Sequence, residues 1–281
     1  QYLTFLGPLR AGPDGHAWFG GSGARAYGGL LLLEFGDEYQ RPGIAVASEL
    51  ARRLKTSAPL AAAALLVAFA GAIPWGTLAA RRRGRAFDRA SGLVAFVLGA
   101  LPSFWAALLL VMVCGPLGLD VLPVVGLSSH GLEQRAWPVR AWDVLLHALL
   151  PVLVLGYGSL AYLSRQMRSS MLDALGSDYV RAARARGLRE GLVLRAHALR
   201  NACLPLVTLA AGALPFLVGG SVVVETIFAL PGIGAYAYDG LLARDYNVVM
   251  ATTTLSAALT LLGVFASDFA RYALDPRLRD A

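Results

Sequence analysis

Residues 178–205 read DYVRAARARGLREGLVLRAHALRNACLP, an arginine-rich loop between apolar segments that are each long enough to cross a bilayer. We expect Ser177 to cap a short helix and Gly187 to supply the left-handed residue that ends it. A second short helix should follow, because apolar residues recur at about 3.6 residues per turn. That stripe consists of Leu188, Leu192, Ala196 and Leu199. The pattern predicts a bent helical pair at a membrane surface, with a narrow alanine-lined arm that a groove on a cytosolic partner could grip.

The loop resembles the cytoplasmic loop of permease subunits of ATP-binding cassette importers, which reads Glu-Ala-Ala, three residues, Gly, nine residues and Ile-x-Leu-Pro. The triplet Arg181-Ala182-Ala183, Gly187 and residues 197–200 occupy the corresponding positions. Arg181, His197 and Arg200 depart from the general Glu, Ile and Pro. The runs RAARARGL and HALRNACLP are instead similar to the dipeptide, oligopeptide and nickel branch, whose loop commonly runs close to RTARAKGL and HALRNALLP.

In that family the loop carries the coupling helix, which sits in a cleft of the ATPase subunit and transmits its closure to the membrane helices. The resemblance therefore implies an ATPase-docking role for a set of loop residues. They are Asp178, Tyr179, Arg181, Ala182, Ala183, Arg184, Ala185, Gly187, Leu188, His197 and Leu199. An ordinary basic loop on the cytoplasmic side of a membrane protein is the alternative interpretation.

The composition is typical of a polytopic membrane protein, with 57% hydrophobic and 15% charged residues and a mean hydropathy of +0.58. Five apolar segments of about 20 to 24 residues would each form a helix of about 30 to 36 Å, the thickness of a bilayer core. They cover residues 58–80, 90–113, 144–164, 203–224 and 247–268. The sequence therefore predicts an all-α integral membrane protein with five transmembrane helices in this chain.

The net charge of +7 is unevenly placed along the chain. The loops at 81–89 and 165–200 and the tail from residue 271 hold 16 arginines, whereas the loops at 114–143 and 226–246 hold three. Because cytoplasmic loops are enriched in Arg and Lys, we place the first set in the cytoplasm and expect no nucleic-acid partner. This orientation places the start of the chain outside. A cytoplasmic N-terminus would need one more helix upstream, giving six in the intact protein, and the family resemblance implies a bacterial cytoplasmic (inner) membrane.

We expect the chain to be organised in three parts. Residues 1–57 form an extracytoplasmic N-terminal segment, 58–271 a transmembrane permease domain with its coupling loop at 165–202, and 272–281 a cytoplasmic tail. The N-terminal segment starts with a glycine-rich insert that departs from the family pattern. It ends with an amphipathic stretch, residues 41–55, that predicts an interfacial helix leading into the first span.

Further runs stand in the order found in the family: LPSFW at 101–105, ETIFALPGIG at 225–234, RDY at 244–246 and LDPR at 274–277. The second and third are similar to the periplasmic segment between the last two helices, which helps form the outer gate near the binding protein. The implied gate residues are Glu225, Pro231, Gly232, Arg244, Asp245 and Tyr246. On residue chemistry alone, Pro231 and Gly232 mark a turn, so a structural connector is the alternative.

The energy source should lie on other subunits. A phosphate-binding loop needs a lysine within a glycine frame, and the single lysine, Lys55, has none. We expect no enzyme activity, catalytic residue, metal or cofactor on this chain, with ATP and Mg²⁺ bound by partner subunits. The implied partners are a second permease subunit, two ATP-binding cassette ATPase subunits, an extracytoplasmic solute-binding protein and membrane lipid.

The cargo implied by the resemblance is a dipeptide or oligopeptide, with nickel or another small solute as alternatives. Two other classes of function remain open. A secondary transporter or channel would be expected to show a charge relay or an inverted repeat, and neither is visible. A membrane enzyme would need a nucleophile and a base, and neither pattern is present.

Overall fold

The structure is a computed structural model, and it describes residues 35–129, 131–132, 134–211 and 222–274. Within these ranges the chain is helical, and its one β-type contact is an isolated bridge between Asp37 and Ala45. The predicted all-α fold is confirmed. The glycine-rich insert and most of the predicted tail lie outside the described residues.

The first described helix, α2 (Val46–Arg81), runs without a break through the predicted interfacial helix and the first predicted span. Its 36 residues correspond to about 54 Å, far more than a bilayer core of about 30 Å. The helix predicted at residues 41–55 therefore begins at Val46 and leads into the first span, and its place at the membrane interface stays a prediction. No glycine or proline lies between residues 46 and 58 to end the helix, and the later Pro59 and Pro74 lie inside it.

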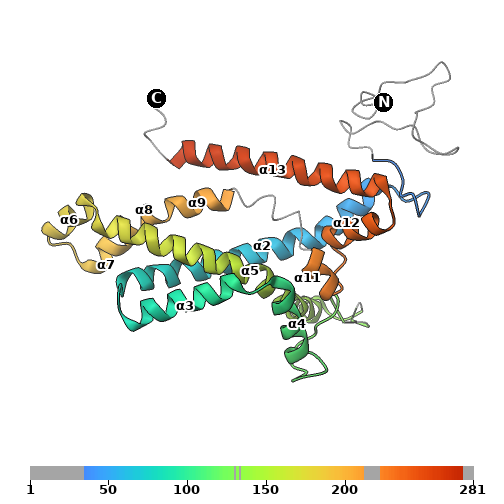
Figure 1. The fold of residues 1–281 in the computed structure, drawn as a ribbon, viewed down its shortest axis with the longest axis horizontal. Helices are drawn as coiled ribbons and strands as arrows, with labels where there is room; N and C mark the ends of the chain where they lie inside the picture. Colours follow the sequence, from blue (N-terminus) through green and yellow to red (C-terminus); the bar gives the residue numbers. More distant parts are fainter. Residues whose placement is uncertain (1–34, 130, 133, 212–221, 275–281) are drawn as a thin grey trace, which may run out of the picture.

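The second predicted span, residues 90–113, consists of two helices. α3 (Ala86–Ala100) and α4 (Ser103–Cys114) are bent by 98° relative to each other. Pro102 explains the break, because a proline disfavours the helical conformation at the residue before it. Leu101 is accordingly extended, with φ −70° and ψ 124°. The prediction of one uninterrupted helix is wrong here, and α4 projects away from the other helices (Figure 1).

α5 (Trp137–Gly176) packs along α2, and two glycines permit the close approach of their backbones. A Cβ on Gly76 of α2 would lie 2.6 Å from the carbonyl oxygen of Ser164. A Cβ on Gly156 of α5 would lie 3.0 Å from the carbonyl oxygen of Ala64. Larger side chains at either glycine would push the two long helices apart.

Among the described residues, α2, α5 and α13 (Tyr246–Leu274) are long and apolar enough to cross a membrane, and the bent pair α3–α4 would make a fourth span. They match four of the five predicted spans. The remaining one, residues 203–224, begins in α9 (Leu204–Ala211) and reaches α11 (Val222–Ile227). The residues between these helices lie outside the described part, so a continuous helix there stays a prediction.

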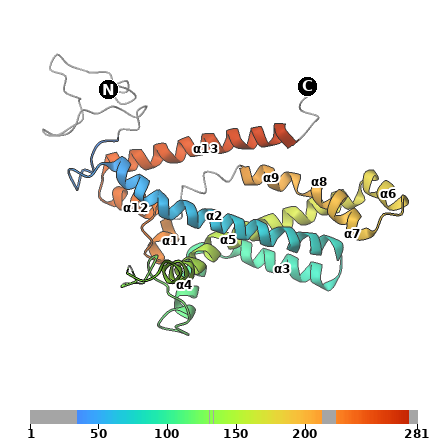
Figure 2. The ribbon, with the colours of Figure 1, turned by 180° about the vertical axis from the view of Figure 1, so that it is seen from behind.

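The helices separate two ends of the molecule. Figures 1 and 2 show α6 (Asp178–Ala185) and α7 (Glu190–Leu192) at one end of the longest axis. Towards the other end lie α11 and α12 (Ile233–Leu242), beside the starts of α2 and α13. The arginine-rich loop and the predicted gate residues are therefore at opposite ends of the long helices.

Candidate functional site

Gly187 ends α6 in the left-handed conformation that the sequence predicts, with φ +76°. The N–H of Gly187 donates to the carbonyl of Arg184 at 2.9 Å, and the N–H of Leu188 donates to the carbonyl of Ala183 at 3.4 Å. These two bonds form a Schellman motif, which satisfies the last carbonyls of a helix. The glycine thereby turns the chain between the two helical parts of the arginine-rich loop.

Ser177 does not cap α6. Its hydroxyl donates backwards to the carbonyl of Ala174 at 2.5 Å, and no side-chain bond caps the helix. The prediction of a serine cap is wrong because α5 continues to Gly176 and offers the hydroxyl a carbonyl in its last turn. In the first turn of α6, Asp178 instead forms an exposed ion pair with Arg181.

The second helical part of the loop differs from its predicted geometry. α7 leads into a π-helix, η2 (Val193–Leu199), followed by α8 (Arg200–Ala202). The i→i+5 bonding of a π-helix changes which residues share a face. The buried residues are Val193, Leu194 and Ala198 of η2 and Ala202 of α8. The predicted apolar stripe is therefore wrong at Leu192 and Ala196, which are exposed.

One face of the arginine-rich loop is part of the chain's own core, and the other is exposed. Val180 and Ala183 of α6 are fully buried in a cluster that includes residues of α2, α5 and η2. On the other side of α6, Ala182 and Ala185 are exposed, and Tyr179 is 40% exposed. The loop is thus held by the membrane helices while it presents a surface of small side chains.

An ion pair spans the bend at Gly187. The guanidinium of Arg184 donates from Nε and Nη2 to the two carboxylate oxygens of Glu190, at 3.1 and 2.8 Å. The hydrogen bond from Arg184 holds the pKa of the Glu190 carboxyl below its ordinary value. Because both side chains are exposed, the pair contributes little to stability, although it joins α6 to α7 across the bend.

The structure brings all the predicted docking residues into this one bent element. Leu188, His197 and Leu199 are half-buried on its inner side. Those accessible to a partner are Asp178, Tyr179, Arg181, Ala182, Arg184, Ala185 and Gly187.

At the opposite end, Glu225 of α11 is buried and bonds two other elements. Its Oε2 accepts the N–H of Ala235 at 2.8 Å, and its Oε1 accepts the hydroxyl of Ser57 at 2.8 Å. The Ser57 oxygen in turn accepts the N–H of Ile233 at 2.8 Å. We call Ser57, Glu225, Gly232, Ile233 and Ala235 the Glu225 cluster.

The Glu225 cluster closes the start of α12. Ile233 and Ala235 belong to the first turn of this helix, whose N–H groups lack intrahelical partners and whose dipole favours a negative charge. Burial raises the pKa of the Glu225 carboxyl, and the hydrogen bonds that it accepts oppose that rise. The carboxylate therefore acts as a cap that one helix provides for the next.

Pro231 and Gly232 form the turn that the sequence predicts, in which the N–H of Gly232 donates to the carbonyl of Leu230 at 2.8 Å. The position of the Glu225 carboxyl also leaves no room for a side chain at Gly232. A Cβ at this position would lie 2.2 to 2.4 Å from three carboxyl atoms of Glu225.

Asp245 joins three segments of the chain. Its carboxylate accepts the N–H of Val248 at 3.2 Å, in the first turn of α13, and the N–H of Tyr39 at 2.6 Å. Asp245 is 3% exposed. Its neighbours Arg244 and Tyr246 are more accessible, and Arg244 adopts a left-handed φ of 53° where α12 ends.

Replacing Asp245 with alanine should lower the free energy of unfolding by about 1 to 3 kcal/mol, because α13 loses its cap and the Tyr39 N–H loses its acceptor. The matched control, Asp245→Asn, keeps an oxygen acceptor and should lose less. The unfolding midpoint of the detergent-purified protein measures both. An unchanged midpoint in Asp245→Ala would show that this aspartate does not hold the segments together.

Several residues of this end cannot be found from the sequence alone. The hydroxyl of Tyr236 donates to Glu38 at 2.8 Å across 198 positions of sequence. The guanidinium of Arg53 lies over the Tyr236 ring, 4.9 Å from its centroid. Ser57 and Glu38 sit outside every motif of the sequence, so only the folded chain reveals them.

Comparisons with known proteins agree with this architecture. The family model described as "Binding-protein-dependent transport system inner membrane component" matches residues 72–280. The oligopeptide transport system permease protein AppB of Bacillus subtilis is 37% identical over 251 residues, which cover 89% of this chain and 78% of AppB. The dipeptide transport system permease protein DppB of Escherichia coli K12 is 35% identical over 252 residues, 84% of this chain and 74% of DppB. DppB of Bacillus subtilis is 31% identical over 250 residues, 89% of this chain and 76% of DppB.

Proposed function

Since the chain belongs to the family of binding-protein-dependent transport system inner membrane components, we propose that it is one of two permease subunits of an ATP-driven peptide importer. It forms half of the translocation pathway in a bacterial cytoplasmic membrane. Separate ATPase subunits bind ATP and Mg²⁺. Their closure pulls on the arginine-rich loop and rocks the membrane helices, so that the pathway opens to alternate sides.

The observation that carries this proposal is the two-sided arginine-rich loop. A loop buried on both faces could not be gripped, and a loop exposed on both faces could not transmit force. Here Ala183 is fully buried against the long helices while Ala182 and Ala185 remain exposed. A rigid connection to α2 and α5 together with a smooth outer surface suits a docking element.

The opposite end is the proposed site of peptide delivery. There the Glu225 cluster and Asp245 join α2, α11, α12 and α13, so a force applied at this end reaches several helices at once. We assign this end to the outer side, where an extracytoplasmic binding protein would dock and where the gate would open.

Isolation of the tagged protein from native membranes in mild detergent tests the proposal. We expect a second permease and two ATPase subunits to co-purify with it, and ATP hydrolysis to depend on their presence. A self-sufficient homo-oligomer would instead support a channel or a secondary transporter.

The cargo is tested separately. The relatives named above are an oligopeptide and two dipeptide permeases, which favours peptides over nickel for this chain. Mass spectrometry of the ligand retained by the associated binding protein should identify a short peptide. If the binding protein retained a metal complex instead, the cargo would be nickel or another small solute and not a peptide.

A further inference from the structure

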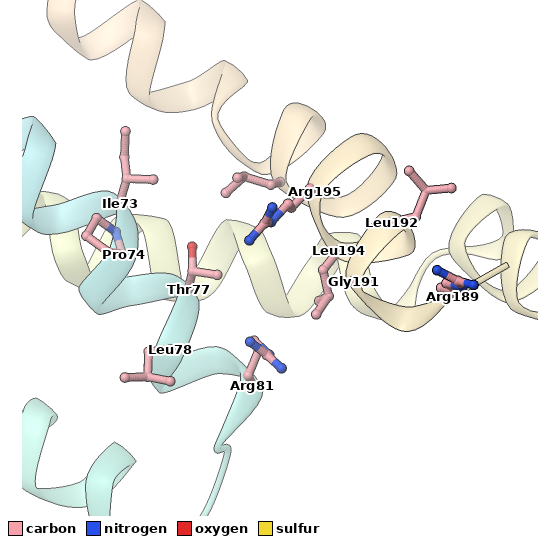
Figure 3. A pocket seen from close by; sticks show the side chains of 11 residues that line it. Ile73, Pro74, Thr77, Leu78, Arg81, Arg189, Gly191, Leu192, Leu194 and Arg195 are labelled. Atoms are coloured by element: carbon pink, nitrogen blue, oxygen red, sulfur yellow. The ribbon is translucent and has the colours of Figure 1, made fainter.

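A large pocket lies between the end of α2 and the second half of the arginine-rich loop. Its volume is about 1020 Å³, enough for a ligand of several functional groups. Figure 3 shows the side chains that line it. α2 contributes Ile73, Pro74, Thr77, Leu78 and Arg81, and the loop contributes Arg189, Gly191, Leu192, Leu194, Arg195 and Leu199.

The pocket has an apolar part and a basic part. The apolar wall includes Ile73, Pro74 and Leu78 of α2, a helix apolar enough to cross a membrane. The basic part is Arg81, the last residue of α2, together with Arg189 and Arg195. Ile73 lies eight positions before Arg81, so the apolar wall reaches about 12 Å along α2 from the basic part.

The three arginines carry positive charge that the described residues do not neutralise. Within the described ranges, none of the three forms an ion pair with a carboxylate. Glu190, whose carboxyl is influenced by Arg81, is already bonded to Arg184. In Figure 3 the side chain of Arg195 extends towards the turn of α2 that carries Thr77.

Thr77 provides a second observation at the same pocket. Among the described residues, its hydroxyl is the one buried side-chain nitrogen or oxygen atom without a hydrogen-bond partner. A buried hydroxyl without a partner costs free energy, which a neighbouring group that accepts or donates a hydrogen bond would recover. A polar headgroup beside Arg195 would bring hydrogen-bonding atoms next to this turn.

We propose that the pocket binds an anionic phospholipid of the cytoplasmic leaflet, with its headgroup in the basic part and the upper part of an acyl chain along α2. Basic pockets between membrane helices on the cytoplasmic side suit anionic headgroups, and guanidinium groups suit phosphate. A soluble anion would leave the apolar wall uncovered. An ATPase in the cytosol would reach the arginines but not Ile73, which lies deeper along the helix.

Such a lipid would link the end of α2 to the arginine-rich loop, because its headgroup would contact both elements. The bound lipid would thus restrain the movement that the loop makes when the ATPases close. Lipid binding involves a different face of the loop from Ala182 and Ala185 and can be measured apart from docking, whereas the effect on loop movement rests on the proposed function.

The assembled transporter, delipidated in detergent and titrated with phosphatidylglycerol, tests the proposal by native mass spectrometry. The variant Arg81→Gln/Arg189→Gln/Arg195→Gln should bind this lipid about 100-fold more weakly, because each basic residue near a membrane surface contributes measurably to anionic lipid binding. The lysine version of the same triple variant should retain much of the affinity, since it keeps the charge. Phosphatidylethanolamine should bind the unchanged protein weakly.

The matched control is Arg83→Gln/Arg89→Gln/Arg200→Gln, which removes three exposed arginines of the same loops outside the pocket. It should bind phosphatidylglycerol as the unchanged protein does. Equal losses in both triple variants, or equal binding of the two lipids, would overturn the proposal. Competition by inorganic phosphate alone would point to a soluble anion and would also overturn it. If the variant Arg81→Gln/Arg189→Gln/Arg195→Gln no longer bound the ATPase but still bound phosphatidylglycerol, the pocket would be a binding site for the ATPase and the proposal would be overturned.

Discussion

Replacing Gly187 with valine should weaken association of the ATPase with the assembled transporter about tenfold and reduce peptide uptake accordingly, while the protein still inserts into the membrane. The φ of +76° at this position disfavours any residue with a Cβ by roughly 1 to 2 kcal/mol, and a β-branched residue suffers most. If only a fraction of the molecules have the loop in its docking conformation, the apparent affinity for the ATPase is reduced in proportion to that fraction. Uptake of labelled peptide in cells and co-purification of the ATPase measure the two effects.

The control for this variant is Gly187→Asn. Asparagine adopts left-handed conformations more readily than other non-glycine residues, and a Cβ added at this position would have no atom within 4 Å. The asparagine variant should therefore keep most of the activity. Normal uptake by the valine variant would show that the bend at Gly187 is not needed for coupling.

Replacing Gly232 with alanine is expected to lower the free energy of unfolding by about 1 to 3 kcal/mol, the usual cost of overpacking a buried site. The added methyl group would overlap the Glu225 carboxyl at 2.2 to 2.4 Å, and the carboxyl has little freedom because Ser57 and Ala235 hold it. Displacement of this carboxyl would also uncap α12. The unfolding midpoint in detergent and the yield of folded protein measure the effect.

A double-mutant cycle identifies the cause. Glu225→Ala should destabilise the protein by itself, because it removes the acceptor for Ser57 and Ala235. Adding Gly232→Ala to Glu225→Ala should cost little more, since the overlapping carboxyl is then absent. Additive losses would mean that Gly232 matters for a reason other than contact with Glu225.

The sequence allows the long helices and the bend of the arginine-rich loop to be predicted, because both depend on local patterns. A run of more than 20 apolar residues is recognisable without knowledge of its neighbours. Likewise, the need for a left-handed residue after an alanine-rich helix points directly to Gly187. The structure confirms α2, α5 and α13 as long apolar helices and Gly187 as the left-handed residue at the bend.

The failures arise where distant or neighbouring elements override a local pattern. Pro102 lies in the middle of an apolar run whose hydropathy conceals the 98° bend. Ser177 has the chemistry of a cap but bonds to Ala174, because α5 continues up to the residue before it. The stripe in the second half of the loop fails because no local pattern of residues predicts a π-helix there.

The Glu225 cluster shows a further limit. Glu225 precedes Gly232 by seven residues in the run ETIFALPGIG, which predicts a turn but not that the glutamate caps the next helix. Ser57, another member of the cluster, lies 168 positions from Glu225. A bond across that separation depends on how α2 packs beside α11 and α12.

Site-specific cross-linking tests the docking role of the loop most directly. In a transporter with Cys114 and Cys203 replaced by serine, single cysteines at Ala182 or Ala185 would carry a photoreactive maleimide. We predict a covalent adduct with the ATPase subunit from either position, and none from the exposed Tyr246→Cys at the opposite end. Absence of an adduct at both alanines, or equal adducts at position 246, would contradict the account.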